Sequence, residues 1–310
     1  MGEKDAVEKT LESYNDVFAD IVNGLLFHGK QVVAAEELTD AQTFSMYKAD
    51  GKHLSQDRDV AKFWQEGRIR LSFIGLENQT KPDANMPLRV IGYDGAAYRA
   101  QLRDDGQEEL YPVLTLVLYF GTEERWGKMT SLKKRLKNIR PELEPFISDY
   151  EIHVFELAWL DDETVATFKS DFRDVVEFLR CKQRHSRYTG TDRQLRHVHE
   201  VLALLRLVSA DDAFTRVEPE LIERQTKKGG ETTMCDVVQM IRDEGFAAGE
   251  RQGFANGERQ GFANGTNGLY TILSTLQAEG RNDELARILS DRNYMAQVVA
   301  RQSRQGKSGI

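Results

Sequence analysis

Residues 59–80 read DVAKFWQEGRIRLSFIGLENQT, and this stretch decides the fold class that the sequence predicts. Apolar and polar side chains alternate through its middle, a period of two that is typical of a β-strand. We expect a first strand over 59–64, a turn ending at Gly67, and a second strand over 68–79. The two strands would pair as a hairpin.

The residues on either side of this hairpin predict an α/β protein. The run YPVLTLVLYF, residues 111–120, is apolar almost throughout and suits a central strand buried on both faces. A sheet whose strands alternate with helices in this way is a mixed sheet flanked by helices. The expected helices are 6–27, 86–102 and 162–183, the further expected strand is 151–159, and 31–51 is expected to form a loop or short helices.

The C-terminal third of the sequence is helical in pattern and contains a repeat. Residues 245–265 read GFAAGERQGFANGERQGFANG, with glycine at every fourth position. On a helix these glycines would form one stripe without side chains, which favours close contact with another helix. A flexible linker is the alternative. The sequence therefore predicts a core domain over 1–208, a helical extension over 209–265, and a C-terminal helical hairpin and tail over 266–310.

Composition limits the possible classes of protein. The net charge is −8 and the pI about 5.4, which counts against a simple basic nucleic-acid-binding domain. Residues 125–140, however, hold seven basic residues and no acidic one. Lys133, Lys134 and Arg135 at its centre could hold phosphates of DNA, although a solvated helix face is the alternative.

Several classes are disfavoured by what the sequence lacks. It contains no apolar run of membrane-spanning length, no signal-peptide pattern and no GxxxxGK[ST] motif, so we expect neither a membrane partner nor a nucleotide cofactor. Cys181 and Cys235 are too few for a disulfide framework. We therefore expect a cytoplasmic protein.

Polar side chains end the second strand of the hairpin. Glu77 and Gln79 are two residues apart, so they point to the same face and should lie at the rim of the core. Asp59 can reach the same point across the hairpin. Two carboxylates, with the backbone carbonyl of Asn78, make an oxygen site suited to Mg²⁺ or Mn²⁺. The spacing alone is also typical of an ordinary strand end.

Longer motifs give a more specific indication. They are Asp16–Phe18, Gln56–Val60, Gly75–Thr80, Met86–Tyr93, Tyr111–Gly121, Trp126 and Thr233–Val237. With these motifs the chain resembles the PD-(D/E)XK nuclease superfamily and, within it, the Rpn family of recombination-promoting, transposase-like nucleases. This resemblance implies a restriction-endonuclease-like core and a Mg²⁺-dependent DNA endonuclease with Asp59, Glu77 and Gln79 as catalytic residues.

The superfamily usually has lysine where this chain has Gln79. Rpn-like members commonly have glutamine at this position, so the resemblance implies that the departure is shared with the family. A glutamine offers only neutral hydrogen bonds, so the metal must supply more of the electrostatics. The resemblance also makes Asp16 a candidate catalytic carboxylate near the metal, with a solvated helix residue as the alternative.

Arg89 and Tyr93 are four residues apart on the expected helix 86–102, which follows the strand that carries Glu77 and Gln79 (the motif strand). We expect both to flank the site and contact DNA; a structural salt bridge is the alternative for Arg89. Cleavage of both DNA strands would suit a homo-oligomer formed through the C-terminal helices. A non-catalytic DNA-binding protein with the nuclease fold, and an RNA-directed nuclease, remain alternative functions.

Overall fold

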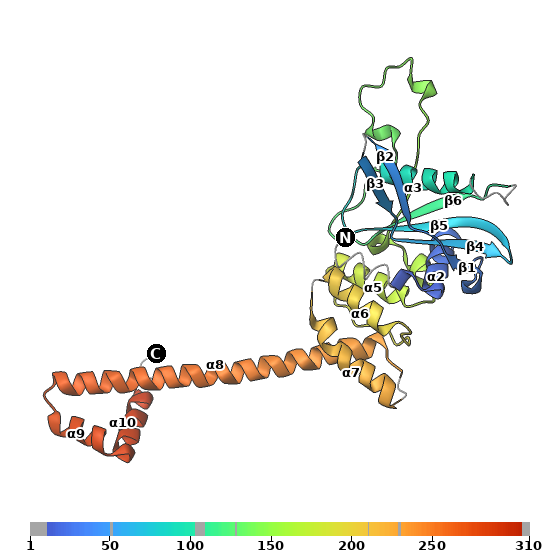
Figure 1. The fold of residues 1–310 in the computed structure, drawn as a ribbon. Helices are drawn as coiled ribbons and strands as arrows, with labels where there is room; N and C mark the ends of the chain where they lie inside the picture. The colour runs from blue at the N-terminus through green and yellow to red at the C-terminus, as the bar shows by residue number, and fades with distance from the viewer. Residues whose placement is uncertain are drawn as a thin grey trace. The chain divides into compact units, whose positions relative to one another are not determined.

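The structure is a computed structural model that describes residues 11–49, 52–102, 109–127, 129–209, 211–228 and 231–305 (Figure 1). The chain divides into two compact units, Met1–Ile241 and Arg242–Ile310. The first unit contains the sheet and the helices that cover it.

A five-stranded mixed sheet forms the centre of the first unit. The order across the sheet is β1-β4-β5-β6-β7. The β1/β4 and β4/β5 pairs are antiparallel, whereas β5/β6 and β6/β7 are parallel. A separate antiparallel pair is formed by β2 and β3. The strands are β1 (Leu38–Asp40), β2 (Phe44–Ala49), β3 (Lys52–Asp57), β4 (Val60–Glu66), β5 (Ile69–Gln79), β6 (Val113–Tyr119) and β7 (His153–Glu156).

Helices cover both faces of the sheet (Figure 1). On one face α2, α5 and α6 enclose the larger apolar core, to which the sheet contributes residues such as Leu76 and Leu116. On the other face α3 packs through Met86 and Val90 against Val117 of β6. The helices of this unit are α2 (Asn15–Leu26), α3 (Met86–Gln101), α4 (Asp162–Thr167), α5 (Phe172–Gln183), α6 (Val198–Ser209) and α7 (Ala213–Lys228), with short 3-10 turns η1 (Ala35–Glu37), η2 (Lys133–Arg135), η3 (Glu144–Phe146) and η4 (Leu157–Trp159).

The mixed α/β architecture predicted from the sequence is confirmed and is compatible with a nuclease-like core. The β4–β5 hairpin, the buried strand β6 and helix α3 lie where the sequence places them. The single helix predicted over 6–27 is interrupted by a turn at Ser13 and Tyr14, so that α2 begins only at Asn15, and its expected beginning at residue 6 lies outside the described residues.

Three further local predictions need correction. The segment 31–51, expected to be a loop or short helices, contains the strands β1 and β2. β1 pairs with β4 at the edge of the sheet, and a strand of three residues is too short to leave a periodic signal in the sequence. The predicted helix over 162–183 is interrupted between α4 and α5, where the Asp20 carboxylate of α2 accepts hydrogen bonds from the backbone of Lys169 and Ser170. The strand expected over 151–159 ends at Glu156 and continues as η4.

The second unit is helical. It comprises most of α8 (Met234–Ala278) with α9 (Asn282–Ser290) and α10 (Arg292–Gln305). The glycine repeat lies within α8, which is one continuous helix there. The end of α8 packs against α9 and α10 around Ile272, Leu276 and Ile288. Within the described ranges, no helix is both long and apolar enough to cross a bilayer.

Candidate active site at the end of β5

Asp59 and Glu77 lie at neighbouring ends of the β4–β5 hairpin. Asp59 occupies the bend directly before β4, and the register Val60↔Leu76, continued by one residue, sets it opposite Glu77. Asp59 Oδ2 accepts a hydrogen bond of 2.6 Å from the backbone N–H of Asn78. The hairpin therefore holds the first carboxylate against the strand that carries the second.

Glu77 is surrounded by polar groups from its own strand and from α3. Arg89 of α3 forms an ion pair with Glu77 Oε1. Gln79 Nε2 donates a hydrogen bond of 3.2 Å to the same oxygen. Nε and Nη2 of Arg89 also donate to the hydroxyl of Tyr93, at 3.3 and 3.2 Å. Four of the residues expected from the sequence, Glu77, Gln79, Arg89 and Tyr93, are thus in one hydrogen-bonded group.

Glu77 does not lie at the rim of the core as the strand pattern predicts. Its side chain is only 1% exposed, because α3 extends over this end of the sheet, whereas Gln79 is half-buried. A carboxylate ionised in such a position needs a compensating positive charge. Arg89, 39% exposed, supplies that charge at the protein surface.

The charges of this group affect the ionisation of its members. Burial raises the pKa of Tyr93 above its ordinary value, and the negative charges of Glu77 and, more weakly, Asp59 raise it further, against the opposing effect of Arg89. Both carboxylates therefore act on the same hydroxyl. At neutral pH Tyr93 is a neutral hydrogen-bond donor and cannot serve as a phenolate base.

Asn78 points its side chain to the opposite face of the sheet. Asn78 Nδ2 donates a hydrogen bond of 2.7 Å to Glu12 Oε2, and Glu12, which is fully buried, precedes the turn that leads into α2. Because both backbone groups of a strand residue face the same neighbour, the Asn78 carbonyl shares the side on which its N–H meets Asp59. Glu12 was not predicted, since an acidic residue near the start of an amphipathic helix is ordinarily solvated.

Asp16 lies elsewhere on the first helix. Its two carboxylate oxygens are each 3.2 Å from His197 Nε2, and Arg196 Nη1 is 3.8 Å from Oδ2. These contacts join α2 to the start of α6. Of the two acidic residues, Glu12 is the one that hydrogen-bonds to the motif strand.

The basic segment lies near the N-terminal end of α3. Lys133, Lys134 and Arg135 form η2, and Lys133 pairs with Glu144 at 3.5 Å. Arg135 Nη2 donates a hydrogen bond of 3.0 Å to Asn85 Oδ1, and Asn85 is the residue that precedes α3. The helix that carries Arg89 and Tyr93 therefore begins beside the basic segment.

The donors at this site are suited to an oxygen-preferring divalent cation. Among the described residues, no group of three or more His, Cys, Asp or Glu side chains is arranged to hold a metal ion. Mg²⁺ does not require such a group, because it usually keeps several waters and binds one or two carboxylates together with substrate phosphates. The pair Asp59 and Glu77 fits that pattern.

The strand-end pair of carboxylates lies on an α/β fold that is compatible with a nuclease-like core. Residues 32–211 match the family described as "Putative transposase, YhgA-like". The chain therefore belongs to that family, which is the Rpn family of the PD-(D/E)XK superfamily. No curated protein and no solved structure matches the chain. The match includes Asp59, Glu77 and Gln79 but neither Glu12 nor the glycine repeat.

The ion pair between Arg89 and Glu77 predicts a measurable contribution to stability. Arg89→Met removes the cation beside a buried carboxylate. We expect the free energy of unfolding to fall by about 1–3 kcal/mol, less than the roughly 3–5 kcal/mol for breaking a fully buried pair, because Arg89 is 39% exposed. Chemical denaturation at pH 7 measures the change.

Arg173→Met is the matched control, because Arg173 pairs with Glu177 on the surface of α5 at 2.7 Å. That change should cost less than about 0.5 kcal/mol. Combining Glu77→Gln with Arg89→Met should recover part of the loss. A cost for Arg89→Met no greater than that of the control would contradict the proposed charge compensation.

Proposed function

We propose that this protein is a metal-dependent nuclease that hydrolyses phosphodiester bonds of DNA. The observation that carries the proposal is the meeting of Asp59 and Glu77 at the ends of adjacent strands, with Asp59 held at 2.6 Å by the backbone of the motif strand. Membership of a transposase-like family supports an association with nuclease chemistry or mobile elements. Strand transfer is not part of the proposal.

Asp59 and Glu77, with the Asn78 carbonyl, would hold the Mg²⁺ or Mn²⁺ ion. When bound, the ion supplies Lewis-acid polarisation of the scissile phosphate and a more acidic water. Glu12 keeps Asn78 in place from the opposite face, at 2.7 Å from Asn78 Nδ2. It is therefore a positioning residue for the motif strand.

Arg89 and Tyr93 are the groups of this site that can bind the phosphate directly. In the structure Arg89 neutralises Glu77. With a divalent cation bound at the carboxylates, the Arg89 guanidinium would be available for a phosphate oxygen. The Tyr93 hydroxyl, a donor at neutral pH, can bond a second oxygen. Gln79 orients water through its neutral amide, so this site has one positive charge fewer than a site with lysine.

The basic segment supports DNA as the substrate class. Arg135 contacts Asn85 at the start of α3, and Lys134 is exposed. A strand whose scissile phosphate lies at Arg89 would therefore pass close to η2. This arrangement supplies the local positive charge that the acidic overall composition lacks.

The burial of Glu77 favours a second candidate function. A carboxylate that is 1% exposed and paired with arginine is also what a fold-retaining, non-catalytic DNA-binding protein would contain. In that protein DNA would bind without metal and would not be cut. A nuclease that acts on RNA is a third candidate, which the cleavage assay described next also tests.

Glu77→Gln tests the catalytic assignment with little change in shape. We expect nicking of supercoiled plasmid in Mg²⁺ to fall at least about 100-fold, because one of the two metal-binding carboxylates becomes neutral. The wild-type protein in EDTA should be equally inactive. Labelled RNA and single-stranded DNA are assayed in parallel to identify the substrate.

Glu177→Gln is the matched control, since Glu177 is a paired glutamate on α5 outside the site. It should nick as the wild type does. Unchanged nicking by folded Glu77→Gln would exclude the site, and DNA binding without any cleavage would select the non-catalytic alternative.

The basic segment predicts a change in salt dependence. Replacing Lys133, Lys134 and Arg135 with glutamine should weaken DNA binding similarly on all sequences. If each side chain contacts one phosphate, the slope of log affinity against log salt should become shallower by about 2.7. Fluorescence anisotropy in EDTA over a range of salt concentrations measures both quantities.

Replacing Arg251 and Arg259, which are exposed residues of α8, with glutamine is the control. These changes should leave the slope of log affinity against log salt unaltered. Equal slopes for the wild type and the triple variant would show that the basic segment is only a solvated surface.

We also propose that α8 mediates self-association. An added Cβ at Gly245, Gly249, Gly253 or Gly257 would meet no atom within 4 Å, so the stripe is open. Phe246 and Phe254, beside the stripe, are 76% and 70% exposed. Several glycines at about 1 kcal/mol each would destabilise an isolated helix. Burial of the two phenylalanines against a second copy would offset that cost.

Light scattering tests this proposal on the full chain and on a form ending at Asp243. We expect an oligomer that dissociates when α8 is shortened or when Phe246 and Phe254 are replaced with glutamine. A monomeric full-length protein, or an unchanged mass after truncation, contradicts self-association through α8.

A further inference from the structure

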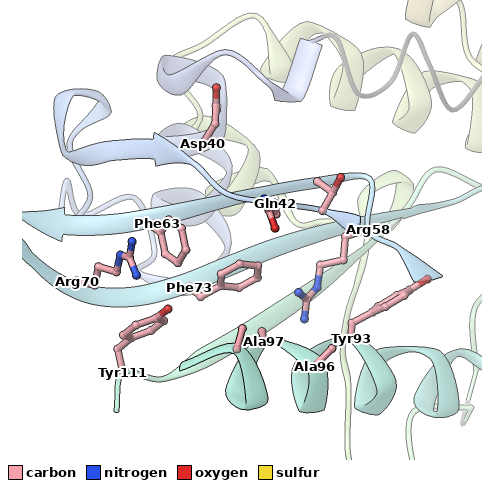
Figure 2. Close-up of a pocket in the computed structure, with 12 residues that line it drawn as sticks. Asp40, Gln42, Arg58, Phe63, Arg70, Phe73, Tyr93, Ala96, Ala97 and Tyr111 are labelled. Atoms are coloured by element: carbon pink, nitrogen blue, oxygen red, sulfur yellow. The ribbon is translucent and has the colours of Figure 1, made fainter. Parts of the chain in front are cut away.

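A cavity of about 380 Å³ lies between α3 and the face of the sheet that carries Glu77 (Figure 2). Its sheet wall contains three aromatic rings, those of Phe63, Phe73 and Tyr111, and the helix side is formed by small residues, including Ala96 and Ala97. The alanines leave space between helix and sheet here, whereas the larger Met86 and Val90 close the gap nearer the start of α3.

The aromatic rings meet at steep angles. The ring of Phe63 is 5.4 Å from that of Phe73, with an interplanar angle of 78°, and 5.9 Å from that of Tyr111, with an angle of 89°. A flat ligand can therefore stack on one ring and meet the edge of another. The cavity is large enough for a nucleobase, and aromatic stacking of this kind is the usual way in which proteins hold unstacked bases.

Two arginines that differ in exposure line the cavity. Arg58 is 3% exposed, and its guanidinium lies 4.7 Å from the centre of the Phe73 ring. Asp94 neutralises it at 2.5 Å. Arg58 Nε has no hydrogen-bond partner among the described residues. Arg70, half-buried, lies over the Phe63 ring at 4.4 Å.

This difference fits the two parts of a nucleotide. A guanidinium already paired with a carboxylate has little net charge to offer, and Arg58 Nε is buried, so Arg58 forms a wall of the cavity beside the aromatic rings and not a phosphate site. Arg70, nearer to solvent, suits the phosphate. Figure 2 shows Arg58 extending into the space between Phe73 and Tyr93.

Gly75 makes the position of Arg58 possible. A Cβ at residue 75 would lie 2.7 Å from Arg58 Cδ, so a larger side chain would push the arginine out of place. The glycine of the motif GLENQ therefore serves the cavity, whereas the glutamate of the same motif serves the candidate active site.

The cavity and the candidate active site lie on the same face of β5 and are linked by Tyr93. Phe73 and Glu77 point to the same face of β5 and are about 13 Å apart along the strand, at roughly 3.3 Å per residue. Tyr93 joins the two places, because it lines the cavity and accepts hydrogen bonds from Arg89, the partner of Glu77. A nucleic-acid strand across Glu77 can therefore extend to the cavity.

We propose that this cavity binds one unstacked nucleotide of the substrate strand, with the base among Phe63, Phe73 and Tyr111 and the phosphate at Arg70. The inference rests on the proposed nuclease function and adds the substrate class: strands with an unpaired base, such as single-stranded DNA, flaps or distorted duplexes. A fully paired duplex would have to release a base before it could be bound in this way.

Ala97→Leu tests the proposal by filling the cavity from the helix side, where leucine is also a good helix former. Affinity for a fluorescein-labelled single-stranded 12-mer is measured by anisotropy in EDTA, so that binding is observed without cleavage. We expect about a 10-fold loss of affinity, within the range of one lost base–aromatic stack. Arg70→Gln, a second variant, should weaken the same strand and make its salt dependence shallower by about 0.7.

Gly95→Leu is the matched control on α3, since nothing lies within 4 Å of a Cβ at that position. It should bind as the wild type does. An otherwise identical strand with abasic residues should bind the wild type and Ala97→Leu equally, because it has no base to stack. Unchanged binding of the normal strand by folded Ala97→Leu would overturn the proposal, as would an abasic strand that binds the wild type as tightly as the normal one.

The two proposals fail in different ways. A wild-type protein that binds single strands through the cavity but does not cleave them would remove the nuclease assignment and leave the cavity assignment. Cleavage by the wild type, together with unchanged strand binding by Ala97→Leu, would keep the nuclease assignment and remove the cavity assignment. Binding of free deoxyadenosine monophosphate in the cavity by a protein with no affinity for strands would overturn the substrate-strand assignment.

Discussion

The constraint on which this structure depends is the burial of β5 up to its polar end. Seven consecutive residues of the strand, from Ser72 to Asn78, are buried. The last two are polar, so each must be satisfied by the layers around it. Glu77 meets Arg89 of α3, and Asn78 meets Glu12 on the opposite face and Asp59 along the edge. The candidate active site is assembled from these compensating contacts.

The same constraint relates stability to the proposed chemistry. A buried carboxylate is tolerated here because an arginine neutralises it, and a divalent cation would neutralise it equally well. Under the proposed function, Arg89 and the cation would therefore be alternative partners of one charge, and Arg89 would bind the phosphate when the cation holds Glu77.

Helix α3 joins the candidate site to the cavity through simple periodicity. Arg89, Tyr93 and Ala97 are four residues apart and share one helix face. Phe73, Gly75 and Glu77 are two residues apart and share one face of β5. These faces of α3 and β5 lie against each other. The charged residues of the two faces form the candidate site at one end, and their small and aromatic residues form the cavity at the other end.

Much of this arrangement was predictable from local sequence. The alternation in 69–79 and the apolar run in 111–120 predicted the central strands, and the two-residue spacing predicted that Glu77 and Gln79 share a face. The hairpin turn also predicted that Asp59 would lie beside Glu77, and Asp59 bonds to the neighbouring Asn78 N–H. These features depend on residues close in sequence, whose geometry is set by the strand and the turn themselves.

The remaining features depend on residues far apart in the chain. The edge pairing of β1, the interruption between α4 and α5 by Asp20, and the burial of Glu77 under α3 are each set by a distant partner. The choice of Glu12 rather than Asp16 as the acidic neighbour of β5 depends on how α2 and the residues just before it pack on the sheet. By itself the sequence determined which side chains share a strand or helix face, because backbone periodicity is local. Only the tertiary structure decided which charges meet and where a cavity remains, because packing between distant segments sets both.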